Sequence, residues 1–96
     1  MKLAIIGTGY VGLITGACFA EFGYQTVCID KDTIRVNDLN NSKCPFYEPG
    51  IDNLLHKHLH KTKLLSFSSS LSQSVNDADI IFITAVSYTH LRAHET

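Results

Sequence analysis

Short, mostly apolar runs alternate along the chain with stretches in which apolar residues recur at helical spacing. The runs predict strands at 3–6, 25–29, 64–67 and 79–83, and their apolar character is typical of strands buried in a parallel sheet. The helical spacing predicts helices over 10–22, 33–39 (which Asp32 or Thr33 can cap), 51–59 and, briefly, 71–75. This alternation of strands and helices predicts an α/β fold with a parallel sheet and right-handed crossovers.

The first predicted helix carries an apolar stripe and one of the three cysteines. The stripe consists of Val11, Ile14, Cys18 and Phe22, widened by Ala17 and Phe19. Cys18 on this stripe and Cys28 within a strand are predicted to be core residues, whereas Cys44 falls in a loop. The cysteines are odd in number and lack a metal-type spacing, so we expect a reduced, cytoplasmic protein.

Length and charge narrow the function classes. Ninety-six residues are enough for one domain, and a formal net charge of −1 gives no general attraction to nucleic acid or to a membrane surface. No stretch reaches the roughly 18 apolar residues that span a bilayer, and the first residues do not resemble a secretory signal. Nucleic-acid and membrane partners are therefore not expected.

A glycine-rich turn follows the first apolar run and opens the first helix. Gly7-Thr8-Gly9-Tyr10-Val11-Gly12 matches the pattern G-x-G-x-x-G. In a dinucleotide-binding turn, Gly7 permits the tight turn, Gly9 lets the backbone approach a pyrophosphate, and Gly12 lets helix and strand pack closely. The context predicts a Rossmann-type fold with strand 3–6 central, strand 25–29 beside it and strand 79–83 on its other side.

Asp30 lies 18 residues after Gly12, at the predicted end of the second strand. A carboxylate there can accept both ribose hydroxyls of an adenosine, and it repels a 2′-phosphate by roughly 4 kcal/mol at about 4 Å and an effective dielectric near 20. NAD is therefore favoured over NADP, although Lys31 and Arg35 weaken this preference. The alternative is a solvated aspartate that merely ends a strand.

Three segments resemble the UDP-glucose/GDP-mannose dehydrogenase family. Residues 1–23 are similar to its opening strand, turn and helix, and residues 77–83 to its fourth strand. Pro45-Phe46-Tyr47-Glu48-Pro49-Gly50-Ile51 is similar to its P-x-Y-E-P-G-L loop, a motif that a generic Rossmann protein has no reason to carry. The resemblance covers residues 1 to about 85.

The resemblance implies a cofactor site and a reaction. It implies that Gly7, Gly9, Tyr10, Val11 and Gly12 contact the NAD pyrophosphate, that Asp30 holds the adenosine ribose, and that Arg35 lies near that ribose. The family oxidises the C6 alcohol of a nucleotide sugar to a carboxylate in two NAD-dependent steps. UDP-glucose, giving UDP-glucuronate, is the favoured substrate, with GDP-mannose, a UDP-N-acetylhexosamine, or a non-catalytic nucleotide-binding module as alternatives.

The family's catalytic cysteine, lysine and aspartate lie far downstream and match nothing here. Residues 1–85 are thus expected to be the first half of an NAD-binding domain, without catalytic activity of its own. The parent enzyme is expected to be a homo-oligomer that binds its nucleotide sugar with other domains. After Ile83 the sequence departs from the family's small-Val-Gly-Thr-Pro pattern, so no cofactor role is assigned to Ser87 or Thr89. Residues 86–96 resemble a translated sequencing adapter and are expected to be a non-native tail.

Two further groups of polar residues have a structural explanation and a chemical one. His56 and His60 are four residues apart, close enough on a helix to share a metal ion, and His58 lies between them. A metal site needs a third ligand and a supporting shell, so a solvated polar face is favoured and no metal is expected. Glu48 is expected to cap or pair in its loop rather than to act as a catalytic carboxylate.

Overall fold

The computed structural model describes residues 1–44 and 49–84 of the chain. Four parallel strands form one sheet in the order β3-β2-β1-β4, as predicted. The strands are β1 (Lys2–Ile6), β2 (Gln25–Ile29), β3 (Leu65–Ser68) and β4 (Ile80–Ile83). The predicted role of Glu48 and the predicted non-native tail, 86–96, lie outside the described residues.

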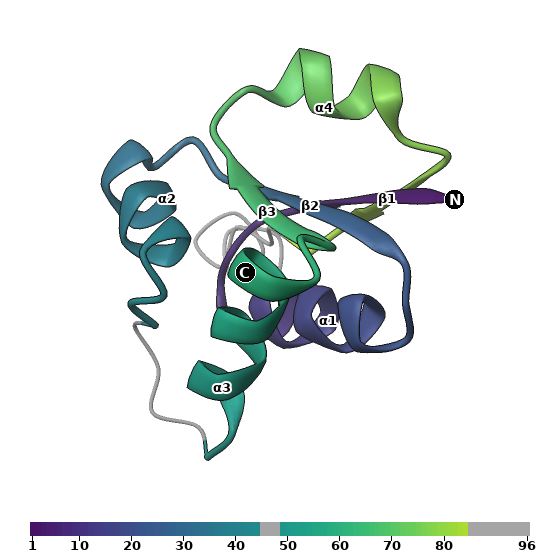
Figure 1. Cartoon of the computed structure of the whole chain (residues 1–96). Helices are drawn as coiled ribbons and strands as arrows, with labels where there is room; N and C mark the ends of the chain where they lie inside the picture. Colours follow the sequence, from purple (N-terminus) through teal and green to yellow (C-terminus); the bar gives the residue numbers. More distant parts are fainter. Residues whose placement is uncertain (45–48, 85–96) are drawn as a thin grey trace, which may run out of the picture.

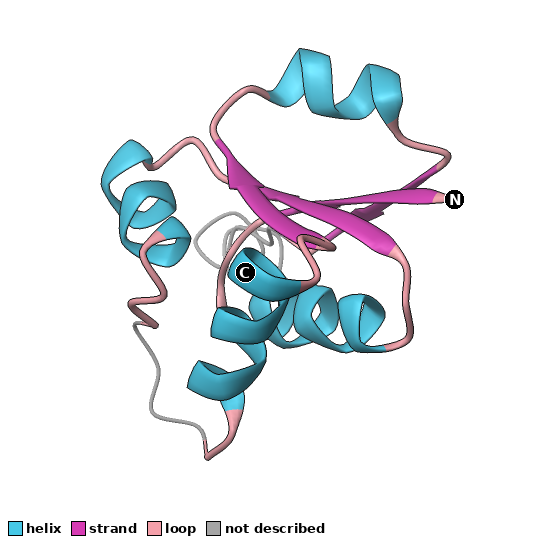
Figure 2. Cartoon of the chain, in the orientation of Figure 1, coloured by secondary structure: helices cyan, strands magenta, loops and turns pink. Residues whose placement is uncertain are grey.

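Helices cover both faces of the sheet, as the alternating pattern predicts (Figures 1 and 2). They are α1 (Tyr10–Glu21), α2 (Thr33–Asn40), α3 (Ile51–His56), which continues as a π-helical segment η1 (Lys57–Lys61), and α4 (Leu71–Asp77). α1 and α3 lie on one face and α4 on the other. Asp32 caps α2, because its carboxylate accepts from the N–H groups of Ile34 and Arg35 at 3.1 Å each.

α1 packs on the sheet through a face that only partly overlaps the predicted stripe: Ala17 is buried and Ile14 and Phe19 pack against the core, as predicted, but the centre of the face is shifted. Its buried residues are Gly12, Leu13, Gly16, Ala17 and Ala20. Cys18 is exposed, so its prediction as a core residue is wrong, and Val11 and Phe22 are 61% and 75% exposed. The cause is the closeness of the helix to the sheet: a Cβ on Gly16 would lie 2.5 Å from the Cys28 sulfur. Only the small-residue face fits there, and Cys28 is buried as predicted.

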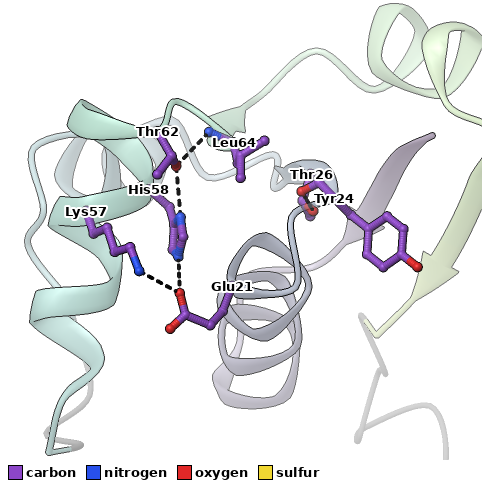
Figure 3. Close-up of polar contacts among 7 residues, drawn as sticks. All are labelled: Glu21, Tyr24, Thr26, Lys57, His58, Thr62 and Leu64. Atoms are coloured by element: carbon purple, nitrogen blue, oxygen red, sulfur yellow. Dashed lines mark hydrogen bonds and ion pairs between the residues drawn. The ribbon is translucent and has the colours of Figure 1, made fainter.

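His58 is buried, which corrects its predicted place on a solvated face. Its Nε2 lies 2.9 Å from Glu21 Oε1, its Nδ1 lies 2.8 Å from Thr62 Oγ1, and Lys57 Nζ lies 3.0 Å from the same Glu21 oxygen (Figure 3). His56 and His60 are exposed, as predicted. Among the described residues, no group of three histidine, cysteine, aspartate or glutamate side chains could hold a metal ion.

β4 is more exposed than its apolar sequence predicts. Ile80 and Ile81 are each 41% exposed and Ile83 is 74% exposed. β4 is the last strand in the sheet order and pairs only with β1, so one long edge has no neighbour in the described part of the chain. Its attachment to β1 extends beyond the strand itself, because the N–H groups of Asp79 and Thr84 donate to the carbonyls of Lys2 and Ile6.

No helix in residues 1–44 and 49–84 has the length and apolar character needed to cross a membrane.

Candidate functional site: the carboxyl edge of β1 and β2

The glycine-rich turn leads directly from β1 into α1. Gly7 has a φ of +110°, a backbone conformation that strongly favours glycine, and its N–H donates to the Ile29 carbonyl at 2.7 Å. Gly12 lies against the turn so closely that a Cβ there would be 2.1 Å from the Gly7 oxygen. The backbone therefore requires glycine at both positions, for the reasons that the motif predicts.

Gly9 is the N-cap of α1 and differs from the other two glycines. Its φ and ψ of −66° and −173° are open to any residue, and a Cβ there would meet nothing within 4 Å. The first N–H groups of a helix have no partner inside the helix, and the helix dipole makes this end partially positive. Tyr10 and Val11, in the first turn, are 48% and 61% exposed. This arrangement can accept an anionic group against exposed backbone.

Asp30, at the end of β2, is held by the turn and by the start of α2. Its Oδ2 accepts from both the backbone N–H, at 3.2 Å, and the hydroxyl of Thr8. Its Oδ1 accepts from the Asp32 N–H at 3.0 Å. An ionised carboxylate has about four acceptor positions, and donors from the described residues occupy three of them, two on Oδ2 and one on Oδ1. The predicted bonds from Asp30 to both ribose hydroxyls stay a prediction, with Oδ1 accepting from fewer donors than Oδ2 among the described residues.

The surroundings of Asp30 keep its carboxyl ionised. Partial burial by itself would raise the pKa, but hydrogen bonds from the Thr8 hydroxyl and from the N–H groups of Asp32 and Thr8, together with the positive charge of Arg35, hold the pKa of Asp30 below its ordinary value. The site thus presents a negative charge at neutral pH. A negative charge there repels a phosphate and attracts hydroxyl donors.

Arg35 comes from the first turn of α2 and reaches back to the glycine turn. Its Nη1 donates to the Thr8 carbonyl at 3.4 Å.

A cleft of about 310 Å³ opens beside Asp30, between the carboxyl ends of β1 and β2 and the start of α4. It is lined by Ile6, Gly7, Ile29, Asp30, Lys31, Ser69 and Leu71. All seven residues predicted for the cofactor site therefore gather at one edge of the sheet, where α/β proteins bind their ligands.

Two residues of this edge were not predicted from the sequence. Thr8 is fully buried and joins the turn to Asp30. Thr84, just after β4, donates its hydroxyl to the Ile6 carbonyl at 3.0 Å and would collide with a Cβ on Gly12. The available signal was the residue type: a small hydroxyl side chain at the end of a parallel strand lies at the same edge as the turn.

Other chemically active side chains lie away from this edge. A second cleft, of about 290 Å³, lies between α4 and the sheet and includes none of the predicted cofactor residues. Burial raises the pKa of the Cys28 thiol to about 12, so it stays protonated at neutral pH and is a packing residue. The described residues thus concentrate the candidate chemistry at the glycine turn.

Comparison with known proteins gives one family. Residues 1–89 match the profile of the UDP-glucose/GDP-mannose dehydrogenase family, NAD binding domain. The UDP-glucose 6-dehydrogenase of Pseudomonas aeruginosa is 45% identical over 83 residues, which are 86% of this chain and 18% of that protein.

Solved structures agree with this match. A GDP-mannose dehydrogenase from Pseudomonas aeruginosa superposes with a TM-score of 0.85 at 30% identity, over 91% of this chain and 20% of that one. A UDP-D-ManNAc dehydrogenase from Pyrococcus horikoshii gives 0.80 at 27%, over 88% and 20%. The chain spans about a fifth of the length of these relatives. The chain belongs to the UDP-glucose/GDP-mannose dehydrogenase family, and residues 1–89 match part of its NAD-binding domain.

Proposed function

We propose that NAD binds along the carboxyl edge of β1 and β2. The pyrophosphate lies against Gly7, Gly9 and Gly12 and the exposed first turn of α1, where Tyr10 and Val11 flank it. The adenosine ribose donates its hydroxyls to the Asp30 carboxylate, where Oδ1 accepts from fewer donors of the described residues, and Arg35 lies beside that ribose. The observation that supports this arrangement is the ionised carboxylate of Asp30, fixed beside an exposed helix N-terminus.

The choice between NAD and NADP tests this site. Asp30→Ala should weaken NAD binding by roughly 1.5–3 kcal/mol, because a hydrogen bond to a charged acceptor is lost. The same substitution should reduce the difference in affinity between NAD and NADP. Asp52→Ala, which removes an exposed carboxylate from α3, serves as the control and should leave both affinities unchanged. Calorimetry that gives equal affinities for the two nucleotides with the wild-type chain would reject this site.

We further propose that the enzyme to which this domain belongs oxidises UDP-glucose to UDP-glucuronate with two NAD, in the cytoplasm. The 45% identity to a UDP-glucose 6-dehydrogenase supports UDP-glucose. The superposition on a GDP-mannose dehydrogenase, with a TM-score of 0.85, favours GDP-mannose as the second candidate.

The substrate is tested with the protein encoded by the complete reading frame. Two NADH should form for each UDP-glucose, with little turnover of GDP-mannose or of UDP-N-acetylmannosamine. The 96-residue chain should form no NADH with any of them, because hydride transfer needs the sugar held against the nicotinamide and this domain supplies only part of the cofactor site. Preferred turnover of GDP-mannose would retain the family and overturn the substrate.

A further inference from the structure

Thr8 occupies a position that the G-x-G-x-x-G motif leaves open to any residue, yet its side chain is as fully buried as the core. It is 0% exposed, and its hydroxyl and backbone N–H both donate to one oxygen of Asp30, a residue 22 positions later in the chain. A buried hydroxyl normally bonds to whatever acceptor is near. Here the acceptor is the carboxylate of Asp30, to which the proposed NAD site assigns the ribose.

The two donors from Thr8 fill the acceptor positions of Oδ2. The Asp32 N–H takes one position of Oδ1, so among the described residues the oxygen with fewer donors is the one that Thr8 does not touch. Rotation of the carboxylate would break at least one of these three bonds. Charged groups from the neighbouring elements complete the surroundings: Arg35 on α2 donates to the Thr8 carbonyl, and Lys31 lines the same cleft as Asp30.

We propose that Thr8 is a positioning residue for cofactor selection: its hydroxyl locks Asp30 in the orientation that offers Oδ1 to the adenosine ribose. The inference deepens the proposed NAD site and depends on it. It also couples the two halves of the site, because one residue lies both in the pyrophosphate turn and on the ribose carboxylate. A site locked in this way gains affinity by reducing the ordering that binding requires.

Thr8→Val removes the hydroxyl and preserves the shape of the side chain. The NAD-to-NADP affinity ratio should fall about tenfold, because a carboxylate that is free to turn binds the ribose less well and can move away from a 2′-phosphate. The pKa of Asp30, followed through its carboxyl carbon resonance, should rise because the side-chain hydrogen bond is gone. Thr8→Ser, which keeps the hydroxyl, should restore both values.

Thr26→Val is the matched control. Thr26 is also buried, at 1% exposed, and its hydroxyl donates to the Tyr24 carbonyl at 3.0 Å, at the opposite end of β2. Both valine variants should lose stability, but only Thr8→Val should change the pKa of Asp30 and the affinity ratio. If Thr8→Val and Thr26→Val give the same pKa and the same ratio, Thr8 is only a packing residue and the proposal is wrong.

The titration needs no ligand, so it separates this inference from the proposed function. A wild-type chain that binds neither nucleotide would count against the NAD site. An Asp30 pKa that does not move in Thr8→Val would count against the role of Thr8, even in a chain that binds NAD tightly.

Discussion

Replacing Gly9 by alanine should separate cofactor binding from folding. Of the three motif glycines, Gly9 alone has a backbone conformation open to any residue and free space where a Cβ would go. Gly7 has a positive φ, and Gly12 lies against the Gly7 carbonyl. The fold therefore accounts for two of the glycines, and the third requires a different explanation, which is the approach of a ligand to the backbone.

The effect of Gly9→Ala on stability follows from two opposing contributions. Glycine is a better N-cap than alanine, so the substitution should cost about 0.5 kcal/mol at the start of α1. Alanine also restricts the unfolded chain, which stabilises the native state by about 0.4–1 kcal/mol where φ is permitted. The two nearly cancel, so the free energy of unfolding should stay within about 0.5 kcal/mol of the wild-type value.

The effect on NAD should be much larger. A methyl group at Gly9 would occupy the surface on which we place the pyrophosphate, and the affinity should fall at least tenfold, or about 1.4 kcal/mol. Urea denaturation measures the stability, and calorimetric titration with NAD measures the affinity. Tight NAD binding by Gly9→Ala would refute the placement of the pyrophosphate against this residue.

Gly12→Ala is the contrasting variant. Its Cβ would lie 2.1 Å from a backbone oxygen and 2.6 Å from Thr84 Oγ1, so either the turn or α1 must move. We expect a loss of at least about 3 kcal/mol of unfolding free energy, at the upper end of overpacking costs. A Gly12→Ala protein as stable as the wild type would show that the close contact between α1 and the turn is not required.

Three further predictions concern packing, thiol reactivity and pH. Gly16→Ala should lower the unfolding free energy by about 1 kcal/mol, because an overpacking cost of about 1–3 kcal/mol is offset by about 1 kcal/mol of helix propensity. In a protein whose Cys28 is already alanine, the same substitution should be stabilising. Urea denaturation of the wild type, the two single variants and the double variant measures the sign of the Gly16→Ala effect in each background, and equal signs would contradict the steric explanation. Cys18 should react with a maleimide at pH 8 in the native protein, whereas Cys28, with a thiol pKa of about 12, should react only after unfolding. Peptide mass spectrometry distinguishes the two labelled cysteines, and rapid labelling of Cys28 in the native protein would be inconsistent with its burial. The hydrogen bonds from Lys57 and His58 hold the pKa of Glu21 below its ordinary value of 4.5. The stability that these bonds confer is therefore present above pH 4.5 and is lost as the pH falls through the folded pKa. Glu21→Gln should flatten this loss of unfolding free energy at acid pH, and an unchanged loss in denaturation experiments would assign it to other groups.

Local patterns were sufficient to predict the order of elements and the edge that carries the site. Each strand begins and ends within one residue of its predicted range, because short apolar runs that end at glycine or at a polar residue define strands locally. Gly7, Gly12 and Asp30 also lie where the motif places them. These features depend on residues close together in the chain, or on the general rule that parallel strands end at one edge.

The features that were not predicted depend on how closely the elements approach each other. α1 is apolar on most of its circumference, so periodicity alone could not show that Gly16, rather than Cys18, faces the sheet. For His58 a signal was present, since it follows Ile51 by seven residues and Leu55 by three, on the buried face of the helix. The hydrogen bonds that Thr8 donates to Asp30 could not be predicted, because they depend on the orientation of both side chains, and no sequence pattern gives that orientation.

The position of β1 at the centre of the sheet constrains how the protein folds. β1 precedes the other three strands in the chain, yet one of its two neighbours is β4, and the bond from the Lys2 N–H to the Asp79 carboxylate joins residues 77 positions apart. Parallel pairing over such a separation is slow, and until it forms one edge of β1 is open to incorrect partners. A nascent chain that has reached residue 78 already contains the glycine turn, Asp30 and the donors to it from Thr8 and Asp32, but its central strand still lies at the edge of the sheet.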